Sequence, residues 1–198
     1  TVPRTPFTRL MEGVSWINKK VNTITIHPLP NILVQQFELL QLSSELAPLM
    51  SFIQDLSDKI TLKITTTATS ATTNNVLTHT IIMTHKDQTA SLYNRKELSI
   101  RLYLYYLHSM LSNEMNRTGN GNDHVIKWLK NQTFHSCLLA CCYQMILFSY
   151  KDHHLTSHFK TFISLCGINI FNFIKVIEPV IKRDLTLPKP IQIYLKNL

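Results

Sequence analysis

The chain has 198 residues, of which 44% are hydrophobic and 16% charged, so it is too apolar for a disordered polymer and suits one globular domain. It has four glycines, and no three of them stand close enough to form the backbone loop that binds a phosphate or dinucleotide. Walker and Rossmann sites are therefore excluded. No two acidic residues are paired as a general acid and base would be, so enzymes are the least favoured class.

The formal net charge of +8 is unevenly distributed. Residues 1–99 carry nine basic and seven acidic side chains, whereas residues 100–198 carry eleven basic and five acidic ones. The second half should therefore attract an acidic partner. Nucleic acid, an anionic membrane and an acidic peptide all fit this charge, and net charge alone does not choose among them.

Three of the four cysteines fall in one apolar segment, which is not the spacing of a disulfide framework and predicts a reducing compartment. The most apolar stretch runs from Cys137 to Tyr150 and is interrupted by Gln144. It is shorter than the ~20 residues that a membrane-spanning helix needs. No signal peptide is visible, and we expect a soluble intracellular protein without a membrane partner.

The N-terminal third predicts three amphipathic helices. Apolar residues recur at helical spacing over residues 10–21, and the run from His27 to Pro30 interrupts this pattern. Two further stripes follow over residues 29–40 and 46–60. Helices therefore dominate from the start of the chain.

Residues 61–91 contain a polar, threonine-rich stretch that is poor in helix formers and has no packing stripe. We expect an insertion or mobile loop here. A short hairpin around Asn74 and Asn75 is the alternative, because the flanking segments have some β-propensity.

From Asn94 onward the helical pattern is stronger. Asn94 and Glu97 resemble a capping box, and the apolar positions of residues 100–111 cover much of the helix circumference. A short helix should follow Asp123, and the next, over residues 134–150, is apolar on nearly every side. That helix should form the centre of the domain.

Two more helices are predicted near the C-terminus. One starts at Asn169 with the stripe Ile170, Phe173, Ile174, Ile177 and Ile181, and the other follows Pro188. The whole chain, residues 1–198, thus reads as a single all-α bundle of about seven or eight helices around residues 134–150.

Metal or nucleophilic chemistry is conceivable at two places but not favoured. Cys137 and Cys141 are one helical turn apart with His135 nearby, but a buried helical cysteine is usually a small hydrophobic residue. The histidines at positions 153, 154 and 158 lack the glutamate of a zincin helix and suggest a solvated loop. We expect no metal, cofactor or catalytic residue.

Lys175, Glu178 and Lys182 lie at helical spacing on the face opposite the predicted stripe of their helix. Such a set is usually a solvated face with a weak ion pair. For nucleic acid, the basic residues are scattered singly and most aromatic residues fall on apolar stripes, so no direct contact with nucleic acid is expected.

Several segments together resemble the A half of the pocket of retinoblastoma-family proteins, with the best likeness over residues 1–17 and 98–198. The segments are Pro3-Arg4-Thr5-Pro6, Arg101-Leu102-Tyr103, Ser109-Met110-Leu111, Phe134 to Cys141, and Phe173 to Glu178. The resemblance implies a cyclin-like helical fold that packs against a second such domain, the B half. It also implies that the groove for LxCxE-type peptides belongs to the B half.

The resemblance further implies a nuclear transcriptional co-repressor that, with its B half, sequesters the acidic activation peptide of E-two-F-type transcription factors. By similarity, Lys175, Glu178 and Lys182 are the partner-binding residues. Pro179 directly after Glu178, and Ile193 and Lys196 where the family has a lysine and a glutamate, depart from the family pattern. Pro179 predicts a kink near Glu178.

Thr5 with Pro6 forms the only Ser/Thr-Pro pair in the chain, and resembles the family's inhibitory site for a cyclin-dependent kinase. A phosphate on Thr5 would add negative charge and loosen pocket binding. Two rival functions remain: a kinase-activating cyclin and a basic DNA-binding cyclin-fold module, the latter with strongly salt-dependent affinity. A homodimer of the isolated A half would be another way to cover the surface meant for the B half.

Overall fold

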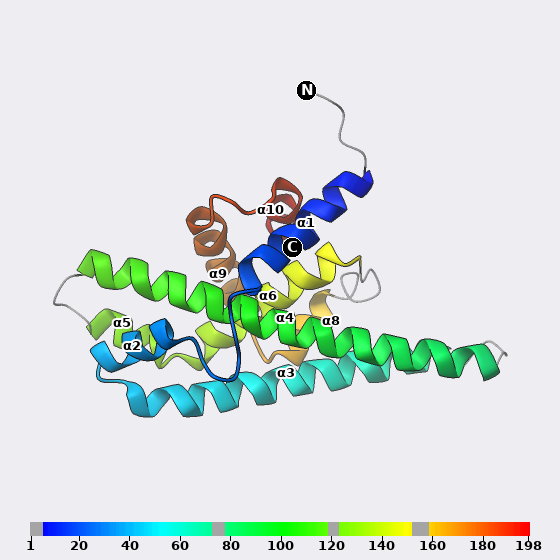
Figure 1. The fold of residues 1–198 in the computed structure, drawn as a ribbon, viewed down its shortest axis with the longest axis horizontal. Coiled ribbons are helices and arrows are strands. Elements are labelled where there is room, and N and C mark those ends of the chain that lie inside the picture. The colour runs from blue at the N-terminus through cyan, green and yellow to red at the C-terminus, as the bar shows by residue number, and fades with distance from the viewer. Residues whose placement is uncertain (1–5, 73–77, 119–122, 152–158) are drawn as a thin grey trace, which may run out of the picture.

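The computed structural model describes residues 6–72, 78–118, 123–151 and 159–198, and within these ranges the chain forms helices and connections without a strand (Figure 1). The helices are α1 (Pro6–Val21), α2 (Asn31–Leu39), α3 (Ser43–Thr72), α4 (Thr78–Thr118), α5 (Asp123–Leu129), α6 (Gln132–Ser149), α8 (Phe159–Leu165), α9 (Ile170–Arg183) and α10 (Lys189–Lys196). The prediction of an all-α, cyclin-like fold is confirmed.

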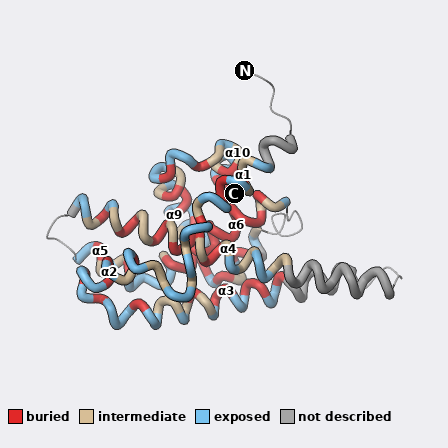
Figure 2. The backbone as a smooth tube through the Cα atoms, viewed as in Figure 1, coloured by how far each residue is buried: buried red, intermediate tan, exposed pale blue. Residues whose placement is uncertain are grey.

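The centre of the fold is α6. It begins after Asn131, whose side chain accepts the backbone N–H of Phe134, and every residue from His135 to Leu147 is buried. Helices α1, α3, α4, α5, α9 and α10 all pack against it. Figure 2 shows the buried positions concentrated in α6 and on the inward sides of its neighbours. The prediction that residues 134–150 form the central helix is therefore confirmed.

The outer helices are arranged on two sides of α4. In Figure 1, α1, α9 and α10 lie above α4, whereas α2, α3 and α5 lie below it. Most residues of α4 between Ile100 and Leu111 are buried, as the broad apolar arc of this segment predicts. Within the described residues, none of the helices is both long and apolar enough to cross a membrane.

The threonine-rich segment is helical in the structure, contrary to the loop or hairpin expected for residues 61–91. Helix α3 continues to Thr72, α4 begins at Thr78, and the two helices pack side by side (Figure 1). Threonine costs a helix only ~0.7 kcal/mol per residue relative to alanine, and extending an existing helix avoids the cost of nucleation. The alternative turn at Asn74 and Asn75 lies outside the described residues.

Helix α8 was not predicted. Its Phe162 and Ile163 are buried, but the helix is short and its apolar positions are too few to show a period. Its formation therefore depends on packing against the rest of the domain, including α3.

We predict that truncating the centre of α6 strongly destabilises the protein. Leu139 is fully buried, so Leu139→Ala should lower the free energy of unfolding by about 2–5 kcal/mol through lost burial and a residual cavity. Leu39 at the end of α2 is 69% exposed, and Leu39→Ala should change it by less than about 0.5 kcal/mol. Urea unfolding measures both, and equal effects would contradict the central position of α6.

His135 is a buried neutral base in this core. Its Nε2 lies 2.6 Å from the carbonyl oxygen of Leu129, which can only accept, so Nε2 carries the hydrogen. Nδ1, 2.8 Å from the Tyr103 hydroxyl oxygen, therefore accepts from that hydroxyl. Burial lowers the pKa of His135 to about 4, outweighing the raising effect of its hydrogen bond to Leu129.

We predict that this histidine makes stability depend on pH. The unfolded chain, with an ordinary histidine pKa of 6.5, binds more protons than the folded chain between pH 6.5 and about 4. Stability should therefore be lost as pH falls through this window, by roughly 3 kcal/mol in total. In urea unfolding at several pH values, the advantage of the natural protein over His135→Gln should shrink toward pH 4. An advantage independent of pH would refute this assignment.

Candidate partner-binding surface

Helix α9 packs on α6 and leaves its opposite face in solvent. It begins after Asn169, whose side chain accepts the backbone N–H of Phe171 at 2.8 Å, as an N-cap residue does. The residues buried along α9 are Phe173, Val176, Ile177 and Val180.

The buried stripe differs from the predicted one. Phe173 and Ile177 are buried as expected, but Ile170 and Ile174 are 44% and 52% exposed, and Val180 takes an inner position instead. The alternatives lie on overlapping arcs of the helix, so the spacing of apolar residues alone did not decide which arc meets α6. As a result, α9 presents apolar side chains to solvent.

The three residues singled out from the sequence are all exposed on α9. Lys182 forms an ion pair with Glu178, one helical turn before it. The hydrogen bond and charge of Lys182 lower the pKa of Glu178. Lys175 instead places its ammonium 4.2 Å from the centroid of the ring of Phe171, a residue that is 62% exposed. The outer face of α9 thus combines two lysines, one carboxylate and exposed apolar groups.

Pro179 lies inside α9, and the helix continues through it to Arg183. A proline removes one helical hydrogen bond, which leaves the carbonyl of Lys175 without its N–H partner. Lys175 is exposed, so water can satisfy that carbonyl, and the buried residues on both sides of Pro179 hold the helix on α6.

Helix α10 packs against α6, α1 and α9. It buries Ile191 and Leu195, whereas Ile193 is 59% exposed and Lys196 is also exposed. The two departures from the family pattern therefore lie at the surface. Neither residue carries a carboxylate, so these two positions add none to the surface of α10.

The structure also reveals an ion cluster that the sequence reasoning missed. Glu114 on α4 pairs with Arg183 at the end of α9 and lies 3.2 Å from the Arg117 guanidinium. Only 9% of the Glu114 side chain is exposed. The sequence did contain a signal for this cluster. Glu114 continues the helical spacing of the buried Leu107 and Leu111, and a carboxylate on a buried stripe requires a partner.

The cysteines behave as the apolar interpretation predicts. All four are free and buried. Burial raises the pKa of Cys137 to about 11 and those of Cys141 and Cys166 to about 12, so each thiol stays protonated at neutral pH. Within the described residues, the structure holds no cluster of three or more histidine, cysteine or acidic side chains that could bind a metal ion.

Two sets of residues noted in the sequence cannot be placed. Thr5, the predicted phosphorylation residue, and the histidines at positions 153, 154 and 158 lie outside the described residues.

Comparison with known proteins decides the family. The model of the retinoblastoma-associated protein A domain matches residues 5–198. The chain belongs to this family. Among curated proteins, retinoblastoma-related protein 1 of Oryza sativa subsp. indica is 26% identical over 99% of the chain. Retinoblastoma-related proteins of Cocos nucifera and Zea mays are 33% and 31% identical over 52% of it.

The retinoblastoma A domain is only part of these relatives. The chain spans 18% of the Oryza sativa protein and 10% of the Cocos nucifera and Zea mays proteins. Membership in the family supports a regulatory role as a pocket protein. It also confirms the resemblance read from residues 1–17 and 98–198, and the matched residues extend across the threonine-rich region between them.

We predict that the Glu114 cluster holds α9 to α4. Glu114→Gln leaves Arg183 without its anionic partner in a largely buried site and should lower the free energy of unfolding by about 1–3 kcal/mol. Glu178→Gln, which removes an exposed ion pair, should change it by less than about 0.5 kcal/mol. Thermal and urea unfolding compare the two variants, and a neutral Glu114→Gln would contradict this role.

Proposed function

We propose that this retinoblastoma A domain is a regulatory binding module. Packed against a B half from the same gene product, it sequesters the acidic, apolar activation peptide of an E-two-F-type transcription factor. The protein then acts as a nuclear transcriptional co-repressor. The proposal involves no catalysis and no cofactor.

The observation that carries the proposal is the outer face of α9. Ile170, Phe171 and Ile174 are 44–62% exposed there, next to Lys175 and on the same helix as Lys182. Singly exposed apolar residues are common, but a contiguous group beside cationic side chains is typical of an interaction site. An acidic peptide with apolar residues matches both components, and the basic charge of residues 100–198 would speed its association.

The ion pair on α9 is compatible with peptide binding. Lys182 and Glu178 are 72% and 68% exposed, and an exposed pair contributes only about 0–1 kcal/mol. A peptide carboxylate can therefore replace Glu178 as the partner of Lys182 at small cost. Glu178 is then available to accept a peptide backbone N–H, as the family resemblance suggests.

Regulation is proposed through Thr5. A cyclin-dependent kinase would phosphorylate it ahead of α1, and the added charge would weaken peptide binding.

The proposal is tested by peptide affinity in the full-length gene product. Reversing both lysines, Lys175→Glu with Lys182→Glu, should weaken binding of a fluorescent E-two-F-type activation peptide roughly tenfold or more, measured by anisotropy. It should also reduce the dependence of the affinity on salt.

A matched control changes the net charge equally elsewhere. Lys59→Glu on α3 with Lys127→Glu on α5, both at exposed positions, should change the affinity less than about twofold. Equal losses would attribute binding to net charge instead of α9. Absence of peptide binding together with capture of a kinase, or with salt-dependent affinity for duplex DNA, would replace the proposal with one of its rivals.

A further inference from the structure

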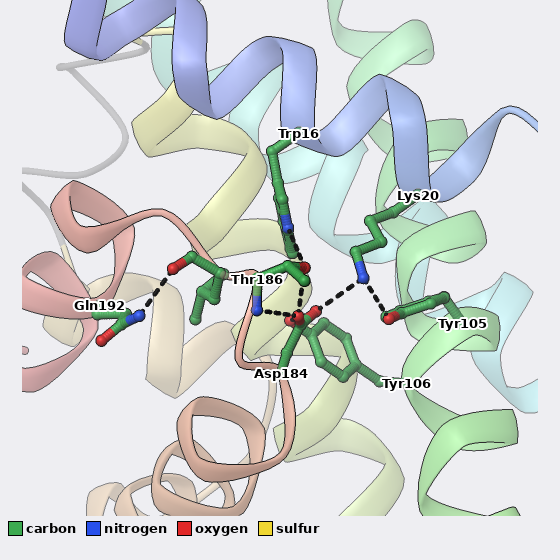
Figure 3. A network of polar contacts seen from close by, with 8 residues as sticks. Trp16, Lys20, Tyr105, Tyr106, Asp184, Thr186 and Gln192 are labelled. Carbon is green, nitrogen blue, oxygen red and sulfur yellow. Dashed lines mark hydrogen bonds and ion pairs between the residues drawn. The ribbon is translucent and has the colours of Figure 1, made fainter.

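A buried carboxylate joins three separate parts of the fold (Figure 3). Asp184, the residue after α9, is 5% exposed, and its Oδ2 lies 3.5 Å from the Lys20 Nζ of α1. The same oxygen accepts the Tyr106 hydroxyl of α4 at 3.4 Å. Asp184 therefore ties α1 and α4 to the connection between α9 and α10.

Its other oxygen shapes that connection. Oδ1 accepts the backbone N–H of Thr186 at 3.0 Å and the Thr186 hydroxyl at 2.6 Å, which is a local turn built on the aspartate side chain. The Thr186 Oγ1 in turn accepts the indole N–H of Trp16 at 3.1 Å. The Asp184 side chain thus fixes the geometry of the turn, and Trp16 of α1 contacts the turn through its hydrogen bond to Thr186.

Lys20 is placed to remain charged in this setting. Its Nζ donates to the Tyr105 hydroxyl and lies 4.6 Å from the centroid of the Tyr105 ring. Burial lowers the pKa of Lys20, but the Tyr105 hydrogen bond and the Asp184 charge outweigh this and raise it overall. The contact between Lys20 and Asp184 is therefore an ion pair between shielded groups.

The turn separates α9, whose outer face is the proposed binding surface, from α10, which packs against α9. Asp184 lies two residues after Lys182, and the connection leads through the buried Leu187 into α10, which carries the exposed Ile193. Gln192 of α10 donates to the Leu187 carbonyl at 2.7 Å, so the start of α10 is bound to the same connection. The direction in which α10 leaves α9 depends on the geometry of residues 184–188.

A contribution to stability alone is a poor explanation for the ion pair of Lys20 with Asp184, because burying charged groups is costly. Desolvation offsets much of the attraction in a shielded ion pair, and apolar residues of similar size often stabilise as well or better. What a directional ion pair does supply is one defined arrangement of the segments that it joins.

We propose that Lys20 and Asp184 are positioning residues, a clamp through which α1 fixes α10 relative to α9 and so sets the shape of the partner-binding surface. The assignment of that surface rests on the proposed function, but the clamp itself does not. Because one half of the clamp is on α1, displacing α1 would release α10 and weaken partner binding.

The test compares three variants of the clamp in the full-length gene product. Lys20→Met removes the cation, Asp184→Asn removes the anion but retains an acceptor for Thr186, and Lys20→Arg keeps the charge. We expect the first two each to weaken affinity for the acidic activation peptide roughly fivefold or more. The affinity of Lys20→Arg should stay within about twofold of that of the natural protein. The double variant, Lys20→Met with Asp184→Asn, should bind the peptide no more weakly than whichever single variant has the lower affinity.

Lys96→Met is the matched control for general destabilisation. Lys96 on α4 is 12% exposed and pairs with Asp58 of α3, whereas Lys20 is 18% exposed. Lys96→Met therefore removes a comparably buried lysine from an ion pair that does not touch the connection between α9 and α10, although its partner Asp58 is 55% exposed and Asp184 only 4%. It should leave peptide affinity within about twofold of the natural protein.

Backbone hydrogen exchange gives a readout that does not require the peptide. Lys20→Met should speed exchange in residues 185–196 relative to Lys96→Met, because α10 loses its fixed attachment.

The outcomes separate this proposal from the proposed function. If the natural protein does not bind the peptide, the proposed function fails, and faster exchange in residues 185–196 still supports the clamp. If it binds and Lys20→Met matches Lys96→Met in both affinity and exchange, the clamp is overturned. Additive losses in the double variant, or no rescue by Lys20→Arg, would also overturn it.

Discussion

The fold depends on the burial of the middle of one helix, α6. Between His135 and Leu147, α6 has no residue left in solvent, so neighbouring helices must enclose it on every side. Helices α4 and α9 contribute much of this enclosure, and α1, α3, α5 and α10 complete it. Each surrounding helix consequently has one face directed at α6, and its remaining face is available for other purposes.

The proposed binding surface is a consequence of this arrangement. Helix α9 uses Phe173, Val176, Ile177 and Val180 to cover α6, which leaves the Ile170 and Ile174 side chains at the surface. A helix with more apolar residues than one contact requires is suited to a second contact. The proposed pocket function makes use of this excess, with Lys175 supplying charge at its edge.

Three buried polar residues each join separate segments of the chain. His135 accepts a hydrogen bond from the Tyr103 hydroxyl and donates one to the Leu129 carbonyl. These two bonds join α4 and α6 to the end of α5. Glu114 attaches Arg183 at the end of α9 to α4, and the next residue, Asp184, contacts Lys20 of α1 and Tyr106 of α4. Burying these groups is costly unless they are paired, so their pairing restricts the helices to one relative arrangement.

The local sequence pattern was sufficient to predict the features that depend on one segment alone. The segment around Leu138 and Leu139 is apolar on nearly every side of a helix, which predicts the central helix. The segment from Phe134 to Cys141 carries the family resemblance that the family model confirms. Tertiary structure alone decided which arc of α9 meets α6, because Ile174 and Val180 are both on plausible arcs. It also decided the contact of Lys20 with Asp184, 164 positions apart, because spacing along a helix carries no information about distant segments. The helical threonine-rich segment was also missed, because it extends helices that already exist, and extension avoids the cost of nucleation despite a weak local propensity.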